Sequence, residues 1–300
     1  MERKFIKIAS LVLMLILMVA FAGCSKDEDN GDAIAGSEKE QKESSGETVQ
    51  ISSLNIGDRV MDESWDWEFR TGYVYVQREG DVTSPITWII VAKDHYNSLG
   101  VTLLCENLIA YFPFDTSRFE NGLLAGQNHW GESGTGTAKH GLRPWLNSNG
   151  IHDGEGFYSA FSDNFKSIVL ETEIPNKEYE KGTAYTTNDK VFIPSSTELG
   201  DTEHIDTYEI GSVYPFFEGA EGKLRTAMIK GDGWGERNYW LRSPNTQGYR
   251  PVGSVYESGF FTNDFADFDS IGVRPVVNVS SSAMVSAEPD ENGVYILKFK

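Results

Sequence analysis

The chain has 300 residues, a formal net charge of −19 at pH 7, and 12% aromatic residues. A charge of that sign argues against nucleic acid as a partner, because phosphate binding needs clustered lysine and arginine. It also argues against electrostatic docking on an anionic membrane surface, whereas the aromatic content is ample for a packed core and for ligand contacts.

The first 24 residues have the layout of a bacterial lipoprotein signal. A basic start ends at Lys7, an apolar run extends from Ile8 to Ala22, and small residues precede Cys24. Such a segment is removed on export. We therefore predict a signal peptide at 1–23, lipidation of Cys24, and attachment through that lipid to the extracytoplasmic face of the bacterial cell membrane. The alternative is an uncleaved anchor, but the apolar run is shorter than the roughly 20 residues that span a bilayer.

The segment from 24 to 50 is rich in acidic residues, lysine, serine and glycine and has few large apolar residues. Such a composition cannot bury enough surface to fold, so it predicts a disordered acidic tether. The folded domain is predicted over 51–300. One cysteine, Cys105, lies in that domain within an apolar run, where a buried and inert thiol is expected.

The predicted elements of this domain are short. Strands are expected at 72–77, 86–91, 101–104, 190–194, 238–243, 272–279 and 294–299, and helices at 142–147 and 159–170. Turn residues between the strands at 86–91 and 101–104 predict a hairpin. Stretches dense in glycine, asparagine, aspartate and serine separate most of the other elements. This order predicts an α+β fold with short strands, two short helices and long ordered loops.

The sequence does not match common enzyme motifs. The stretch at 131–139 resembles a phosphate loop, but Thr137 stands where that motif needs lysine. The sequence contains no GxSxG nucleophile elbow, and its five histidines show no zinc-ligand spacing. Carboxylates are abundant, but no pair is singled out for acid–base chemistry. This pattern favours binding over catalysis.

The segment between Trp240 and Pro275 is the best candidate for a ligand site. Aromatic faces beside amide and carboxylate groups are typical of glycan and peptide recognition. The candidate ligand-binding residues are Asn245, Gln247, Tyr249, Arg250, Tyr256, Phe260, Asn263 and Asp264. The alternative is a pair of core strands joined by a well-packed hairpin. Arg242 and Arg274 fall within apolar strand runs, so each is expected to be buried against a carboxylate or backbone carbonyls.

No cofactor is expected, with calcium as the one weak candidate. Asp264, Asp267 and Asp269 cluster near the end of the same segment, and calcium takes several hard oxygen ligands. Their spacing matches no known calcium loop.

Several motifs in a fixed order give the chain a family resemblance. They are LRPWLN at 142–147, DKVFIPSSTE at 189–198, YWLRSP at 239–244 and GVRP at 272–275. In this order they resemble an uncharacterised domain family of exported and cell-surface bacterial proteins. That family is related to the C-type-lectin-like fold, which formylglycine-generating enzymes share. The resemblance covers roughly 70–280, and it implies a C-type-lectin-like fold with a ligand surface at 245–269.

The resemblance does not carry the activities of the related proteins with it. C-type lectins hold calcium through Glu-Pro-Asn and Trp-Asn-Asp, whereas Asn263 here follows Thr262 and the only similar Glu-Pro-Asp begins at Glu288. Formylglycine-generating enzymes use a cysteine pair, and this domain offers only Cys105. The sequence therefore predicts a lipid-anchored, non-catalytic protein that binds an extracellular protein or glycan. The alternatives are a cell-wall-acting enzyme with unidentified carboxylates and a structural surface component.

Overall fold

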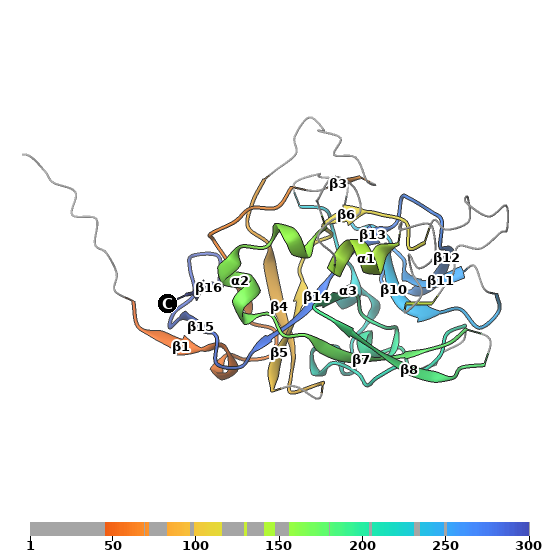
Figure 1. The fold of residues 1–300 in the computed structure, drawn as a ribbon, viewed down its shortest axis with the longest axis horizontal. Coiled ribbons are helices and arrows are strands. Elements are labelled where there is room, and N and C mark those ends of the chain that lie inside the picture. Colours follow the sequence, from red (N-terminus) through yellow and green to blue (C-terminus); the bar gives the residue numbers. More distant parts are fainter. Residues whose placement is uncertain are drawn as a thin grey trace, which may run out of the picture. The chain divides into compact units, whose positions relative to one another are not determined.

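A computed structural model of the chain describes residues 46–68, 70–71, 83–96, 99–115, 129–130, 141–147, 156–179, 181–203, 206–230, 235–248 and 251–299 (Figure 1). The predicted signal peptide, the lipidation site Cys24 and most of the predicted tether lie outside these residues. So do the predicted strand at 72–77 and the candidate ligand residues Tyr249 and Arg250. Within the described residues, no helix is long and apolar enough to cross a membrane.

Among the described residues, the largest sheet has eight strands. Across the sheet these are β1 (Thr48–Gln50), β15 (Met284–Ser286), β16 (Val294–Lys298), β2 (Arg59–Met61), β4 (Thr87–Lys93), β5 (Gly100–Cys105), β14 (Val276–Ser280) and β9 (Val191–Phe192). β4 and β5 pair antiparallel, which confirms the predicted hairpin. β5 is buried along its whole length, as its continuous apolar run predicts.

A second sheet has six described strands and carries the candidate ligand segment. Its order is β12 (Phe261–Phe265), β11 (Pro251–Val255), β10 (Tyr239–Pro244), β13 (Gly272–Val273), β6 (Ala110–Tyr111) and β3 (Arg70–Thr71). A separate antiparallel pair is formed by β7 (Thr172–Lys177) and β8 (Ala184–Asp189). β12 is therefore the last described strand at one edge of the second sheet.

The strand predicted at 272–279 is two strands in different sheets. β13 pairs with β10 and β6, whereas β14 pairs with β5 and β9. The chain passes between the sheets at Arg274 and Pro275. Because proline has no N–H to donate to a strand ladder, it suits the point at which pairing is interrupted. The GVRP motif therefore joins the two sheets.

The α-helices are short, as predicted, and three are described. They are α1 (Leu142–Asn147), α2 (Asp163–Ile168) and α3 (Gly222–Arg225). Single turns of 3-10 helix are η1 (Ile51–Ser53), η3 (Tyr158–Ala160), η4 (Thr197–Leu199) and η5 (Pro215–Phe217). α2 begins later than predicted because Ser162 caps it, accepting a hydrogen bond from the Phe165 N–H at 3.0 Å. The whole is a strand-rich α+β fold with a third short helix that the sequence pattern does not predict.

An aromatic cluster joins α2 and η3 to the large sheet. Trp88 of β4 stacks on Phe165 of α2, with ring centroids 5.8 Å apart, and Trp67 meets Phe157 edge-to-face at 4.8 Å. Trp88, Phe157 and Phe165 are fully buried. Burial of an aromatic ring contributes roughly 1.5–3 kcal/mol by area, so the cluster stabilises the packing of α2 and η3 on the sheet.

The folded part begins earlier than predicted. β1 lies at Thr48–Gln50, inside the segment expected to be disordered, and pairs antiparallel with β15 from Thr48 opposite Ser286 to Gln50 opposite Met284. The Glu47 carbonyl also accepts a hydrogen bond from the Ala287 N–H. The polar composition of 24–50 does not predict this strand. β1 is stabilised mainly by pairing at the edge of the sheet, and of its residues only Val49 packs against the core.

Candidate functional site

The candidate ligand segment forms an antiparallel hairpin of β11 and β12. The pairing runs from Pro251 opposite Phe265 to Val255 opposite Phe261. A tight turn closes it, in which the Tyr256 N–H donates to the Phe260 carbonyl at 2.8 Å. β11 is mostly buried between β10 and β12, whereas every residue of β12 is partly or fully exposed. The hairpin expected as the alternative is therefore present, and its outer strand faces solvent.

Large exposed aromatic side chains gather around β12. Tyr256 is 46% exposed, Phe260 69%, Phe265 43% and Phe268 43%. They are four of the eight large hydrophobic side chains that are exposed in the described part of the chain, and the other four are aliphatic. Phe265 and Phe268 meet edge-to-face with ring centroids 5.5 Å apart. We call these four residues the β12 surface.

Two concavities adjoin the β12 surface. One, of about 490 Å³, lies between the loop from Gly200 to Thr207 and the start of β12, and Phe260 lines it. The other, of about 290 Å³, is lined by Phe265 and Phe268. Both are lined by Asp206 and Asn263, so they adjoin at those two residues. Their sizes are in or near the range of small-molecule sites.

Asn263 has an unpaired acceptor between the two concavities. Its side-chain Oδ1 is buried and has no hydrogen-bond partner among the residues that the structure describes. A buried acceptor without a partner costs about 1–3 kcal/mol, which a ligand hydroxyl or amide would recover. The neighbouring Asp264 is already engaged, because its carboxylate accepts a hydrogen bond from the Ser254 hydroxyl at 2.6 Å.

The other predicted ligand residues divide between the scaffold and the surface. Asn245 is 4% exposed, and its Oδ1 accepts a hydrogen bond from the Gln247 N–H at 2.6 Å, so it shapes the turn after β10. Gln247 itself is exposed and lines the smaller concavity. Asn263, Asp264, Tyr256 and Phe260 lie on the β11–β12 hairpin or its turn, where a loop surface was predicted.

Residues from distant segments complete the larger concavity. Asp206 comes from the loop after η4, and Arg225 ends α3. Arg225 donates to the Leu199 carbonyl at 2.7 Å and lies 4.8 Å from the centre of the Phe261 ring, while burial lowers the pKa of its guanidinium. The sequence pattern does not single out either residue as a ligand contact, because only the folded chain brings them beside β12.

The three candidate calcium ligands do not form a metal site in the structure. Within the described residues, no group of three or more histidine, cysteine, aspartate or glutamate side chains is arranged to hold a metal ion. Asp264, Asp267 and Asp269 belong to these residues, and Asp269 is exposed.

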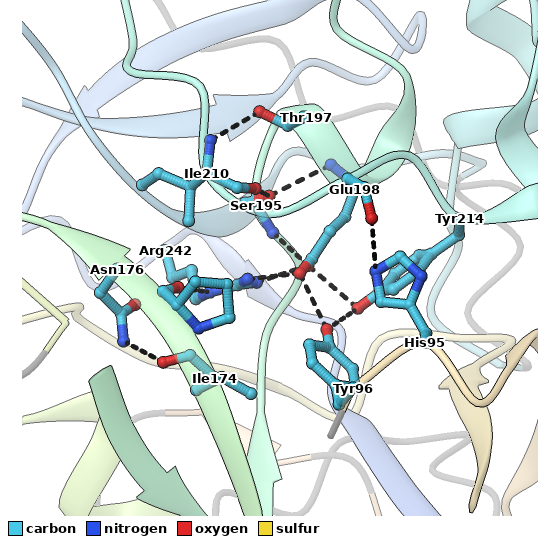
Figure 2. A network of polar contacts seen from close by, with 12 residues as sticks. His95, Tyr96, Ile174, Asn176, Ser195, Thr197, Glu198, Ile210, Tyr214 and Arg242 are labelled. Carbon is cyan, nitrogen blue, oxygen red and sulfur yellow. Dashed lines mark hydrogen bonds and ion pairs between the residues drawn. The ribbon is translucent and has the colours of Figure 1, made fainter. Parts of the chain in front are cut away.

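A buried ion pair lies in the core (Figure 2). The guanidinium of Arg242 donates to both carboxylate oxygens of Glu198, and both side chains are 0% exposed. Tyr96 donates to Glu198 Oε1 at 2.8 Å, Tyr214 donates to Oε2 at 2.9 Å, and the Ser195 N–H donates to Oε2 at 3.0 Å. Arg242 thus has the carboxylate partner that its place in an apolar strand predicts.

The surroundings of this pair keep Glu198 ionised. Burial alone would raise its pKa, but the charge and hydrogen bonds of Arg242 and the Ser195 N–H together hold it below its usual value. Burial raises the pKa values of Tyr96 and Tyr214 and lowers that of His95, whose half-buried ring meets Tyr214 edge-to-face. Because Glu198 and Arg242 are inaccessible, the network stabilises the fold rather than meeting a substrate.

The motifs of the family resemblance meet in this interior. The YWLRSP strand contacts the DKVFIPSSTE segment through the Arg242 N–H, which donates to the Pro194 carbonyl at 3.0 Å. The LRPWLN helix contacts the same segment through Asn147, whose Oδ1 accepts from the Val191 N–H at 3.0 Å. Arg274 of GVRP donates to the Cys105 carbonyl at 2.9 Å. The motifs therefore build the scaffold that holds β12, not the β12 surface itself.

Cys105 is buried, as predicted. Burial raises the pKa of its thiol to about 12, so the thiolate needed for nucleophilic chemistry is not formed near neutral pH.

Comparison with known proteins identifies a family. No curated protein and no solved structure matches the chain significantly. One family model, described as "Domain of unknown function (DUF6273)", matches residues 99–281, which is more than half of the 300 residues. The matched range contains all four motifs and the whole β10–β12 region. The chain belongs to this family of domains of unknown function.

Proposed function

We propose that the protein is a lipid-anchored, non-catalytic binding protein on the extracytoplasmic face of the bacterial membrane, and that it recognises a glycan through the β12 surface. The observation that carries this proposal is the gathering of all four exposed large aromatic side chains of the described residues around one edge strand, beside two adjoining concavities. Monomeric proteins rarely expose such a grouping without an interaction to serve.

The chemistry around β12 suits a sugar. Aromatic rings present flat apolar faces to the C–H faces of a pyranose, and carboxylate and amide oxygens accept hydrogen bonds from its hydroxyls. Asp206 and the unpaired Asn263 Oδ1 lie where the two concavities adjoin, within reach of both groups of rings. The net charge of −19 favours a neutral or cationic glycan over an acidic one.

The proposal includes a C-type-lectin-like fold and anchoring through Cys24. The α+β architecture and the exposed hairpin just before β13 and β14 support the first. The basic start, apolar run and small residues before Cys24 support the second. Replacing Cys24 with serine is expected to abolish lipid labelling and release the protein from the membrane fraction, and membrane retention without lipid would contradict the anchoring.

The glycan proposal is tested on an array of purified glycans and cell-wall polymers. The chain carrying Cys24→Ser, which removes the lipid, is compared with the same chain carrying Phe260→Ala or Phe265→Ala. Each of these is expected to weaken binding about tenfold, or ~1.4 kcal/mol, as loss of an aromatic anchor does. Leu99→Ala is the matched control, because Leu99 is 80% exposed but lines neither concavity.

Two results would contradict this function. One is a glycan that binds the two phenylalanine variants as tightly as it binds the control, since the β12 surface would then not be the site. The other is an array without any glycan bound, which would leave an extracellular protein as the ligand to be sought.

A further inference from the structure

A third and larger concavity adjoins α3. It measures about 700 Å³, and Leu224 of α3 lines it, whereas the next residue, Arg225, lines the concavity beside β12. Its apolar lining includes Ile89, Phe216, Leu224 and Met228. Leu224 is 43% exposed and Met228 48%, so part of this apolar lining is open to solvent. We call this concavity the Arg274 groove, after the buried cation that lines it.

Arg274 is buried with unused hydrogen-bond donors. Its side chain is 2% exposed. Nε donates to the Cys105 carbonyl at 2.9 Å, and Nη1 donates to the Arg225 carbonyl at 3.1 Å and to the Tyr239 hydroxyl at 3.3 Å. An arginine has five N–H donors, and these bonds use three of them. The two N–H groups of Nη2 have no partner among the described residues.

Within the described residues, the charge of Arg274 faces an aromatic ring and no carboxylate, because its guanidinium lies 5.4 Å from the centre of the Tyr239 ring. Its three acceptors are neutral, and it forms no ion pair with a carboxylate in the part of the chain that the structure describes. The contrast is Arg242, which is equally buried but has both oxygens of Glu198 as partners. Arginine is almost never fully buried without a charged partner, because an unpaired buried charge is costly. Nη2 is not among the enclosed side-chain atoms that lack a partner, so its unused donors open into the groove, which therefore presents a cation without a paired carboxylate.

We propose that the Arg274 groove binds a small organic carboxylate that carries an apolar group. The carboxylate accepts hydrogen bonds from Nη2 of Arg274, and the apolar group packs against Phe216, Leu224 and Met228. A carboxylate fits better than a phosphate because a single guanidinium nitrogen is unused. In addition, Glu106 and Glu236 also line the groove and repel a dianion.

The charged groups around the groove are consistent with one bound anion. Glu106 is already paired with Arg59 at 2.7 Å, so it does not compete for Arg274. Lys230 lines the groove as a second cation and favours the approach of an anion in a chain whose net charge is strongly negative. The site is separate from the β12 surface, and its ligand differs in charge from the glycan proposed there.

The test uses matched pairs of acid and amide. The probes are N-acetyl-leucine, N-acetyl-phenylalanine and their uncharged amides, titrated into the chain carrying Cys24→Ser and followed by calorimetry. At least one acid is expected to bind, and its amide is expected to bind at least about tenfold more weakly, because charged hydrogen bonds are about twice as strong as neutral ones.

Variants of Met228 locate the site without disturbing the core. Met228 is half-exposed, so Met228→Glu is expected to fold while placing a competing carboxylate in the groove. It should weaken binding of the acid at least tenfold, whereas Met228→Gln, of similar size, should retain it within about threefold. Phe260→Ala should leave it unchanged, which separates this site from the β12 surface.

Three results would overturn the proposal. They are equal binding of the acid and the amide, absence of binding by either acid, and binding by Met228→Glu that equals binding by Met228→Gln.

Discussion

At the scale of single residues, the Glu198–Arg242 pair is fully buried and fully hydrogen-bonded at its carboxylate. Both side chains are inaccessible, and three further groups donate hydrogen bonds to the carboxylate. A buried pair gains little over an apolar pair of the same shape, but removing one partner leaves an uncompensated charge in the core. The pair therefore makes the fold sensitive to either residue.

Replacing Glu198 with alanine is expected to lower the free energy of unfolding by about 3–5 kcal/mol, because Arg242 is left buried without its partner. Chemical denaturation of the chain carrying Cys24→Ser measures this change. Glu171→Ala is the control, because that carboxylate is exposed. A loss for Glu198→Ala within 1 kcal/mol of the control would show that Arg242 is satisfied without Glu198.

The same pair predicts a dependence of stability on pH. The pKa of Glu198 is lowered from 4.5 in the folded state, so the unfolded chain takes up its proton first as the pH falls. The stability that ionised Glu198 contributes is fully present above pH 4.5 and is lost as the pH falls through its folded pKa. The difference in unfolding free energy between wild type and Glu198→Gln should therefore shrink below pH 4.5. A difference that stays constant or grows with acidification would contradict the lowered pKa.

The sequence could predict that Arg242 has a partner, but not that the partner is Glu198. An arginine inside an apolar strand must find a carboxylate or carbonyls, and Arg242 does. Its partner lies 44 residues earlier, in η4, and nothing local distinguishes Glu198 from the many other acidic residues. In the same way, the aromatic and polar residues of 245–269 could be recognised as a candidate site from the sequence. Asp206 and Arg225 could not, because they lie far from that segment in the sequence and come close to it only in the folded chain.

At the scale of elements, the contact between the β11–β12 turn and α3 holds the hairpin in place. Gly259 has a φ of +84°, a conformation that favours glycine. A Cβ at Gly259 would lie 1.7 Å from the Gly222 carbonyl oxygen, so the turn and the start of α3 approach closely. The position of Phe260 beside its concavity depends on this approach.

Gly259→Ala is expected to cost about 2 kcal/mol more in unfolding free energy than Gly293→Ala, because it adds a backbone clash to the conformational strain. Gly293 is a matched control, with a φ of +75° and nothing within 4 Å of its Cβ position. Urea denaturation of both variants measures the difference. Equal losses would mean that α3 and the turn separate without cost.

Element prediction succeeded where local pattern and structure agree. The β4–β5 hairpin and α1 formed as their apolar runs and turn residues predict. β7 and β8 were missed, because Pro175 and several charged residues in them argue against strands. Among the described strands they pair with each other alone, and every second residue of β7 is buried. Such an isolated pair tolerates proline where a central strand would not.

At the scale of the whole folded part, the family motifs and the β12 surface consist of different residues, whereas Arg274 of the GVRP motif lines the other proposed site. The motifs contribute buried arginines and prolines to the interior between the two sheets, and they were recognisable because such roles restrict residue type. The β12 surface lies between two of these motifs, and its residues are restricted only by the ligand. The α+β class could therefore be predicted from one sequence, whereas the sheet order and the identity of the ligand could not.

The most direct test of the central claim is hydrogen exchange across the whole chain, with and without the glycan that binds best on the array. We predict slower exchange on binding in peptides that cover 255–268 and 199–207, and unchanged exchange around the buried network at 195–198 and 239–244. Protection elsewhere, with exchange of 255–268 unaltered, would contradict recognition through the β12 surface.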